Sequence, residues 1–76
     1  MSEISQRVDA RHLDCPLPLL KAKQALNRMA SGEVLEVLAT DAGSQRDFAV
    51  FARQSGNALL EQSEQGGEFR YVLQKK

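Results

Sequence analysis

Two prolines constrain this chain more than any other feature, because they are its only prolines and both follow closely after its only cysteine. They occur in the run Cys15-Pro16-Leu17-Pro18. Proline is tolerated in the first turn of a helix, where the backbone N–H has no partner to lose. The residue before a proline is pushed away from helical geometry, as an N-cap requires. The run therefore predicts a helix with Cys15 as its N-cap, Pro16 in the first helical position and Pro18 in the third.

The apolar pattern on either side of this run predicts two strand–helix units followed by a hairpin. Alternation of apolar and polar residues indicates strands, and apolar residues spaced three and four apart indicate helices. Gly66 and Gly67 suit a tight turn between the last two strands. The predicted elements are a strand over 4–11, a helix over 16–30, a strand over 33–40, a helix over 44–55, and strands over 58–64 and 68–74.

This βαβαββ order predicts an α/β (α+β) two-layer sandwich as the fold class. Each strand–helix–strand unit implies parallel pairing, and the final hairpin makes the four-stranded sheet mixed. Two helices can cover only one face of the sheet, so the other face is expected to meet solvent. With 76 residues, the chain has room for a single domain over 1–76. The residues expected on the solvent face are Arg7, Glu36, Glu61, Arg70 and Gln74, together with Val34, Leu38, Leu59 and Val72.

The apolar residues on that second face leave the oligomeric state open between a monomer and a weak dimer.

The composition indicates which classes of partner the chain is not expected to bind. Ten basic and ten acidic residues cancel, so the chain lacks the basic excess of a protein that binds nucleic acid through phosphates. The first seven residues carry no apolar signal core, and no stretch approaches the length of a membrane span. We therefore expect no direct contact with nucleic acid or membrane.

The cysteine and histidine counts bear on compartment and cofactors. One cysteine forbids an internal disulfide, and one histidine argues against an internal metal site. An unpaired cysteine fits a reducing compartment. We expect a small cytoplasmic domain without metal or cofactor, held together by packing alone.

Cys15 is the residue on which chemistry is expected. The free N–H groups and the dipole of a helix N-terminus stabilise a thiolate, so the sequence predicts a modestly lowered pKa for this thiol. Arg11 and His12 lie upstream and could add positive charge, whereas Asp14 opposes them. The alternative is that Cys15 is a small buried apolar residue. Its place between a polar loop and a helix start favours exposure.

The surroundings of the thiol indicate a carrier rather than a stand-alone enzyme. The chain has no Cys-x-x-Cys pair, and His12 has no evident acidic or amide residue to orient it, which argues against a catalytic triad. So small a scaffold also lacks room for a substrate pocket. We interpret Cys15 as a nucleophile that one protein loads and another unloads.

The stretch around the cysteine closely resembles the signature of the TusA/SirA-type sulfur carrier family, Asp-x-x-Gly-x-x-Cys-Pro-x-Pro. Here it reads Asp9-Ala10-Arg11-His12-Leu13-Asp14-Cys15-Pro16-Leu17-Pro18. Chain length and element order match the family too. The resemblance extends to Gly32-Glu33, to Asp41-x-x-Ser44-x-x-Asp47 and to Phe69-Arg70-Tyr71. His12 replaces the usual glycine of the signature; histidine adopts a left-handed turn conformation less freely than glycine.

The resemblance implies a function. Cys15 would accept sulfane sulfur as a persulfide from a cysteine desulfurase or another sulfur donor protein. It would then relay that sulfur to an acceptor protein, in tRNA thiolation, molybdenum cofactor maturation or another sulfur-trafficking pathway. The alternative is a non-catalytic regulatory or protein-interaction module of the same fold, in which the thiol is incidental.

Four residues of the first helix are candidates for partner binding. Leu17 and Leu20 fall outside its core-facing arc and beside Cys15, so they form an apolar rim for a partner unless another element covers them. Lys21 and Arg28 form a basic ridge, which is either a solvated helix face or a docking surface for an acidic partner.

The segment before the second helix carries residues with helix-capping chemistry. Asp41, Ser44 and Asp47 have the side chains that bind free backbone N–H groups or interact with the helix dipole. We expect them to cap this helix, with a role in binding as the alternative.

Overall fold

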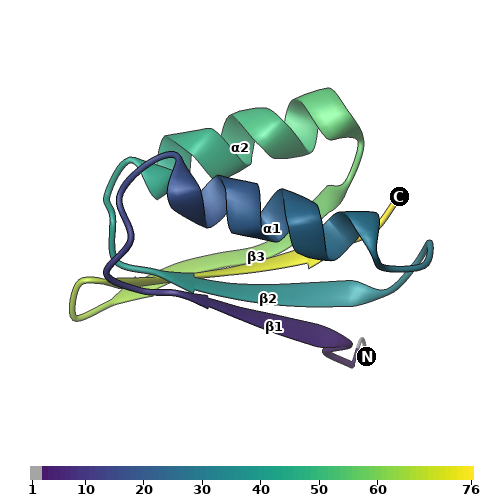
Figure 1. Cartoon of the computed structure of the whole chain (residues 1–76), viewed down its shortest axis with the longest axis horizontal. Coiled ribbons are helices and arrows are strands. Elements are labelled where there is room, and N and C mark those ends of the chain that lie inside the picture. The colour runs from purple at the N-terminus through teal and green to yellow at the C-terminus, as the bar shows by residue number, and fades with distance from the viewer. Residues whose placement is uncertain (1–2) are drawn as a thin grey trace.

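The computed structural model describes residues 3–76 and shows two helices packed on one face of a four-stranded sheet (Figure 1). The βαβαββ order and the two-layer architecture predicted from the sequence are confirmed. The elements are β1 (Gln6–Ala10), α1 (Leu17–Asn27), β2 (Val34–Ala39), α2 (Ser44–Ser55), β3 (Ala58–Gln65) and β4 (Glu68–Gln74).

The sheet has the strand order β1-β2-β4-β3. β1 and β2 are parallel, with Gln6 opposite Leu35 and Ala10 opposite Ala39. β4 runs antiparallel to both β2 and β3, so the sheet is mixed as predicted. Because β1 and β2 are parallel, the loops that follow them leave the sheet at the same edge (Figure 1). One of these loops carries Cys15 and the other leads into α2.

The core lies between the sheet and the two helices. The alternation of β2 turns Leu35, Val37 and Ala39 toward the helices, where each is fully buried. Phe48 of α2 stacks on Tyr71 of β4 with ring centroids 4.3 Å apart. Both rings are completely buried, which ties α2 to the central part of the sheet.

Both ends of α1 differ from the prediction. The helix begins at Leu17 with Pro16 in the N-cap position, so Cys15 is not the N-cap. It ends at Asn27 rather than at Ala30, because the last N–H groups bond three residues back, from Arg28 to Ala25 and from Met29 to Leu26. Such bonds tighten the final turn and end the α-helical pattern.

Leu59 lies on the opposite face of the sheet from the one predicted. It pairs with Leu73 and packs against the core, whereas Glu61 pairs with Val72 on the open face. The register shifts between Leu59 and Glu61. A bulge of this kind inserts one residue and reverses the alternation, so two positions that share a face in a regular strand are separated.

Ion pairs cross the open face of the sheet. Glu36 accepts hydrogen bonds from Arg7 Nε at 3.1 Å and from Arg70 Nε at 2.7 Å, and Arg70 also reaches Glu61 at 3.5 Å. Val34 and Val72 lie on this face but are each only 3% exposed. The face therefore presents mainly charge to solvent. No helix in the described part of the chain is long and apolar enough to cross a membrane.

Candidate functional site

The loop between β1 and α1 is held in place at His12. This residue has a φ of 68°, in the left-handed region that glycine adopts freely and histidine less so. Its backbone N–H donates to Thr40 Oγ1 at 2.8 Å, which joins the loop to the end of β2. The loop therefore makes a left-handed turn at this position although a histidine stands there in place of the family's usual glycine.

Cys15 lies exposed on this loop, next to the start of α1. The peptide bond between Cys15 and Pro16 is cis. Pro18 in the first turn of the helix is fully buried, so it anchors this end of α1 to the core. Exposure of the thiol agrees with the prediction and excludes the alternative of a buried apolar cysteine.

The thiol faces a carboxylate that the sequence did not assign to it. Cys15 Sγ donates a hydrogen bond to Asp47 Oδ2 of α2 over 2.7 Å. This hydrogen bond, the removal of water from the thiol, and the negative charges of Asp47 and Asp41 raise the pKa of Cys15 above its ordinary value. The predicted lowering of the pKa is therefore wrong, because two carboxylates from the segment after β2 outweigh the helix N-terminus.

Arg11, one of the two upstream residues that could add positive charge near the sulfur, is paired with other residues. Its guanidinium makes a bidentate contact with Asp9, in which Nε and one terminal nitrogen each lie 2.9 Å from a carboxylate oxygen. The other terminal nitrogen lies 3.5 Å from Glu68 Oε2. The hydrogen bonds from Arg11 are the main cause that lowers the pKa of Asp9 to about 2. Together with the Glu68 contact they hold the arginine against residues of β1 and β4.

The residues expected to cap α2 have other partners. Gly43 is the N-cap of α2, and no side-chain hydrogen bond caps this end of the helix. Ser44 is buried, and its hydroxyl pairs with the hydroxyl of Tyr71 at 2.6 Å, while Asp47 binds the thiol. Asp41 Oδ2 is buried and has no hydrogen-bond partner among residues 3–76. The capping prediction is wrong for these side chains, although Asp47 lies in the first turn, where its charge suits the helix dipole.

Gly43 marks a close approach between this segment and the thiol loop. A Cβ built there would lie 2.9 Å from Asp41 Oδ2 and 3.6 Å from the Cβ of Cys15. Any larger residue would have to displace the Asp41 carboxylate. The glycine therefore lets the segment before α2 pack against the cysteine.

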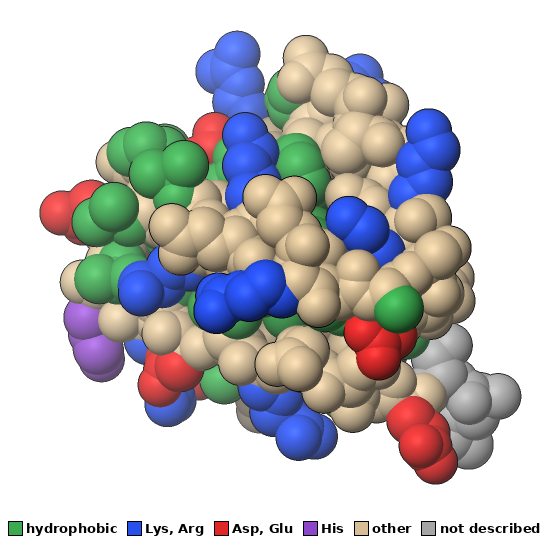
Figure 2. All heavy atoms as spheres, turned by 45° about the vertical axis from the view of Figure 1, so that its right-hand side comes forward, with side chains coloured by type: hydrophobic (Ala, Val, Ile, Leu, Met, Phe, Trp, Pro, Cys, Tyr) green, Lys and Arg blue, Asp and Glu red, His purple; other side chains and the backbone are tan. Residues whose placement is uncertain are grey.

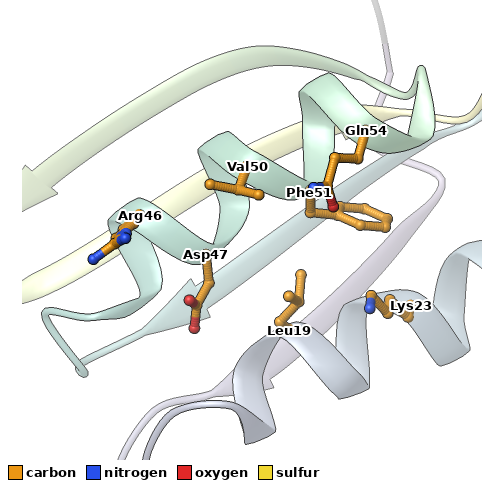
Figure 3. A pocket seen from close by; sticks show the side chains of 7 residues that line it. All are labelled: Leu19, Lys23, Arg46, Asp47, Val50, Phe51 and Gln54. Atoms are coloured by element: carbon orange, nitrogen blue, oxygen red, sulfur yellow. The ribbon is translucent and has the colours of Figure 1, made fainter.

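A groove of about 420 Å³ runs between α1 and α2, and Asp47 lies in its wall (Figure 3). Its lining combines apolar side chains with two cations. Lys23 Nζ lies 5.5 Å from the ring centre of Phe51, within reach of a cation–π interaction. Because Asp47 also binds Cys15, the thiol and the groove share a residue. The lining consists of Leu19, Lys23, Arg46, Asp47, Val50, Phe51 and Gln54.

The partner-binding candidates of α1 lie at different distances from the thiol. Leu17 and Leu20 are 46% and 45% exposed, so no other element covers them. Lys21 is exposed one turn from the helix start, whereas Arg28 is the C-cap, about 16 Å along the helix axis from Leu17. Hydrophobic side chains gather at the end of the molecule that carries the single histidine (Figure 2).

No metal site is evident near the thiol. Within residues 3–76, no three of the His, Cys, Asp and Glu side chains lie close enough together to hold an ion. What the site offers chemically is a single exposed sulfur whose proton is held by a carboxylate.

Asp47 and Asp41 are the site residues that sequence reasoning placed in another role. One signal could have found them. β1 and β2 were predicted to be parallel, and the carboxyl ends of parallel strands meet at one edge of a sheet. The parallel pairing therefore predicts that the acidic residues after β2 lie near the cysteine that follows β1.

Comparison with known proteins gives a consistent result. The model of the family described as sulfurtransferase TusA matches residues 6–75. The sulfur carrier protein TusA of Allochromatium vinosum is 52% identical over 75 residues, which are 99% of both chains. A putative sulfur carrier protein of Neisseria meningitidis serogroup A is 53% identical over 72 residues, 95% of this chain and 97% of the relative.

A solved structure agrees with the fold. The crystal structure of a SirA-like protein from Desulfitobacterium hafniense superposes with a TM-score of 0.81 at 27% identity, and covers 91% of this chain and 95% of that one. Its similarity spans both layers of the sandwich and not only the cysteine loop. The chain described here therefore belongs to the TusA family of sulfurtransferases.

Proposed function

We propose that this protein is a sulfur carrier that holds sulfane sulfur as a persulfide on Cys15. The observation that carries the proposal is the exposed, solitary thiol at the start of α1, in a chain of the TusA family. Relatives named as sulfur carriers match this chain over nearly its whole length, which supports the same role here. Pro16 and Pro18 are proposed to position the thiol at the end of the helix.

The proposed transfer needs no redox partner. The Cys15 sulfur attacks the outer sulfur of a donor persulfide; one S–S bond forms and the donor's S–S bond breaks. The proton of Cys15 Sγ leaves, and the donor cysteine ends as a thiol. The reverse set of bond changes delivers the sulfur to an acceptor, so the carrier returns unchanged.

A carrier of this kind requires a donor protein and an acceptor protein. We propose a cysteine desulfurase or another sulfur donor protein as the source and a downstream sulfur acceptor protein as the destination, in tRNA thiolation, molybdenum cofactor maturation or a related pathway. Leu17 and Leu20 would supply apolar contacts beside the sulfur, and Lys21 would add charge at the next turn. Arg28 lies farther along α1, so it would engage only a partner that covers the whole helix. The cytoplasm, which keeps thiols reduced, remains the predicted location.

The direct test is intact-mass spectrometry after incubation with a cysteine desulfurase and cysteine. We expect a gain of one sulfur atom that dithiothreitol reverses and that Cys15→Ser does not show. Ser has nearly the size of Cys, and the position is exposed, so this variant keeps the fold. A wild-type protein that gains nothing with any desulfurase of its host would refute the carrier role.

One observation favours the alternative of a non-catalytic interaction module. The carboxylate on the thiol raises its pKa, which leaves less of the reactive thiolate. An interaction module would keep its biological activity in Cys15→Ser, whereas a sulfur carrier would lose it.

A further inference from the structure

Asp47 occupies an unusual position for a residue next to a nucleophilic thiol. It comes from the first turn of α2, it accepts the Cys15 hydrogen over 2.7 Å, and it lines the groove between the helices (Figure 3). A carboxylate that accepts this hydrogen stabilises the protonated thiol and disfavours the thiolate, since two negative charges would then face each other. The contact thus disfavours the thiolate, which is the form of Cys15 that attacks a donor persulfide.

The other charges near the thiol do not reverse this balance. Asp41 adds a second carboxylate from the segment before α2, and its charge acts in the same direction. From the loop that carries the thiol come Asp14 and His12, both exposed. The cations Arg46 of α2 and Lys23 of α1 line the groove with Asp47, and neither forms an ion pair with a described residue.

We propose that Asp47 is a positioning residue that holds the empty carrier's Cys15 as a protonated thiol and releases it once sulfur is loaded. The inference rests on the proposed persulfide function. It follows from the bonding of the sulfur itself: in a persulfide, Sγ is bonded to Cβ and to the outer sulfur and carries no hydrogen. The hydrogen bond from Sγ to Asp47 is therefore available only to the empty protein.

This difference gives the two states of the carrier different surfaces. In the empty state Asp47 is bound to the thiol, and the sulfur reacts slowly with small electrophiles and oxidants. In the loaded state the Asp47 carboxylate is free in the wall of the groove, which Arg46 and Lys23 also line. A donor that docks over the groove and draws Asp47 away from the thiol favours loss of the Sγ proton. An acceptor meets a carboxylate that is already released.

The test measures how fast iodoacetamide alkylates Cys15 between pH 6 and pH 10. We expect Asp47→Asn to move the midpoint of the pH profile to lower pH, because the neutral amide does not repel a thiolate and can donate to it. At pH 7 the variant should react at least about twofold faster; the gain is limited because a thiolate of lower pKa is also a weaker nucleophile. Asp47→Glu, which keeps the charge, should restore a midpoint close to that of the wild type.

Asp14→Asn is the matched control. Asp14 is adjacent to Cys15 in sequence and exposed, but it is not among the groups that shift the thiol. We expect its profile to coincide with that of the wild type. Equal midpoints for wild type and Asp47→Asn, or an equal shift in Asp14→Asn, would overturn the proposal.

The released state is tested by the ¹³C chemical shift of the Asp47 carboxyl carbon. In the persulfide form this shift should move toward that of Cys15→Ala, which has no hydrogen to donate; a shift unchanged from the empty wild type would contradict the release. Alkylation needs no sulfur donor, so its outcome is independent of persulfide formation. If Asp47→Asn shifts the midpoint of the alkylation profile but the protein never forms a persulfide, the carrier role is refuted and the role of Asp47 stands. If the persulfide forms but the midpoint does not shift, the role of Asp47 is refuted and the carrier role stands.

Discussion

At the scale of single residues, the thiol and the carboxylate that accepts its hydrogen are 32 positions apart in the chain. The local sequence around Cys15 predicts an activated sulfur, because a helix start stabilises an anion and the upstream arginine could add positive charge. The tertiary structure reverses that expectation by placing Asp47 on the thiol and by engaging Arg11 with Asp9. Local motif reasoning identified the nucleophile but assigned the wrong direction to its pKa.

His12 provides a residue-scale prediction about stability. A left-handed backbone costs a residue with a Cβ about 1 kcal/mol, and the greater unfolded-state freedom of glycine offsets part of this difference. We expect His12→Gly to raise the free energy of unfolding by about 0.5 kcal/mol, measured by urea denaturation. The bond from its backbone N–H to Thr40 is retained.

Gly32→Ala is the opposite control for this prediction. Gly32 has a φ of 90°, and a Cβ there would meet no atom within 4 Å, so backbone strain alone acts. We expect a loss of about 1 kcal/mol. A His12→Gly protein less stable than the wild type would show that the imidazole makes a contact worth more than the strain.

At the scale of elements, the two helices contribute different parts of the site. α1 presents Leu17 and Leu20 beside the thiol, both nearly half exposed. α2 supplies Asp47 and one wall of the groove. The parallel pair β1–β2 brings the two helix starts to the same edge of the sheet, where a partner could contact both.

The exposed leucines of α1 give an element-scale prediction. We expect the double variant Leu17→Ser/Leu20→Ser to slow loading of sulfur from a donor desulfurase about five- to tenfold, since truncating apolar contacts at the centre of an interface costs about 1 kcal/mol or more. The measurement is the rate of persulfide formation by intact-mass spectrometry. The free energy of unfolding should change by less than about 0.5 kcal/mol, because both side chains are exposed.

Leu60→Ser is the matched control for the leucine rim. Leu60 is 43% exposed, close to the value for the two leucines of α1, but it belongs to β3. Its replacement should leave the loading rate unchanged. An equal slowing by Leu60→Ser, or none by the double variant, would show that this end of α1 is not the docking surface.

At the scale of the whole molecule, the order of elements could be predicted because each one carries its own periodicity. β2 shows this well: Leu35, Val37 and Ala39 alternate in the sequence and are all buried. The face of Leu59 could not be predicted in this way, since the bulge between Leu59 and Glu61 depends on pairing with β4. The partner of Cys15 cannot be found from one segment either; it becomes predictable only when the parallel pairing of β1 and β2 is added, which brings the loops after these two strands to one edge of the sheet. Periodicity describes one segment at a time and contains no such information.

The ion pairs of the open sheet face connect β1, β2, β4 and β3 and give the last prediction. Glu36 is central, and its side chain is only 14% exposed. The hydrogen bond from Arg70 is the main cause that lowers its pKa below the ordinary value. At pH 7 we expect Glu36→Gln to reduce the free energy of unfolding by about 1 kcal/mol, because it leaves Arg7 and Arg70 close together without the carboxylate between them.

The pH dependence of this loss has a definite sign. Because the pKa of Glu36 is lower in the folded than in the unfolded state, its stabilisation is complete above the unfolded value of about 4.3 and is lost as the pH falls through the folded pKa. The stability difference between wild type and Glu36→Gln should therefore shrink toward zero as urea denaturation is repeated from pH 7 down to pH 3. Glu61→Gln, whose carboxylate is 65% exposed and 3.5 Å from Arg70, should cost less than about 0.5 kcal/mol throughout. A Glu36→Gln deficit that stayed constant with pH would mean that Glu36 acts through packing and not through its charge.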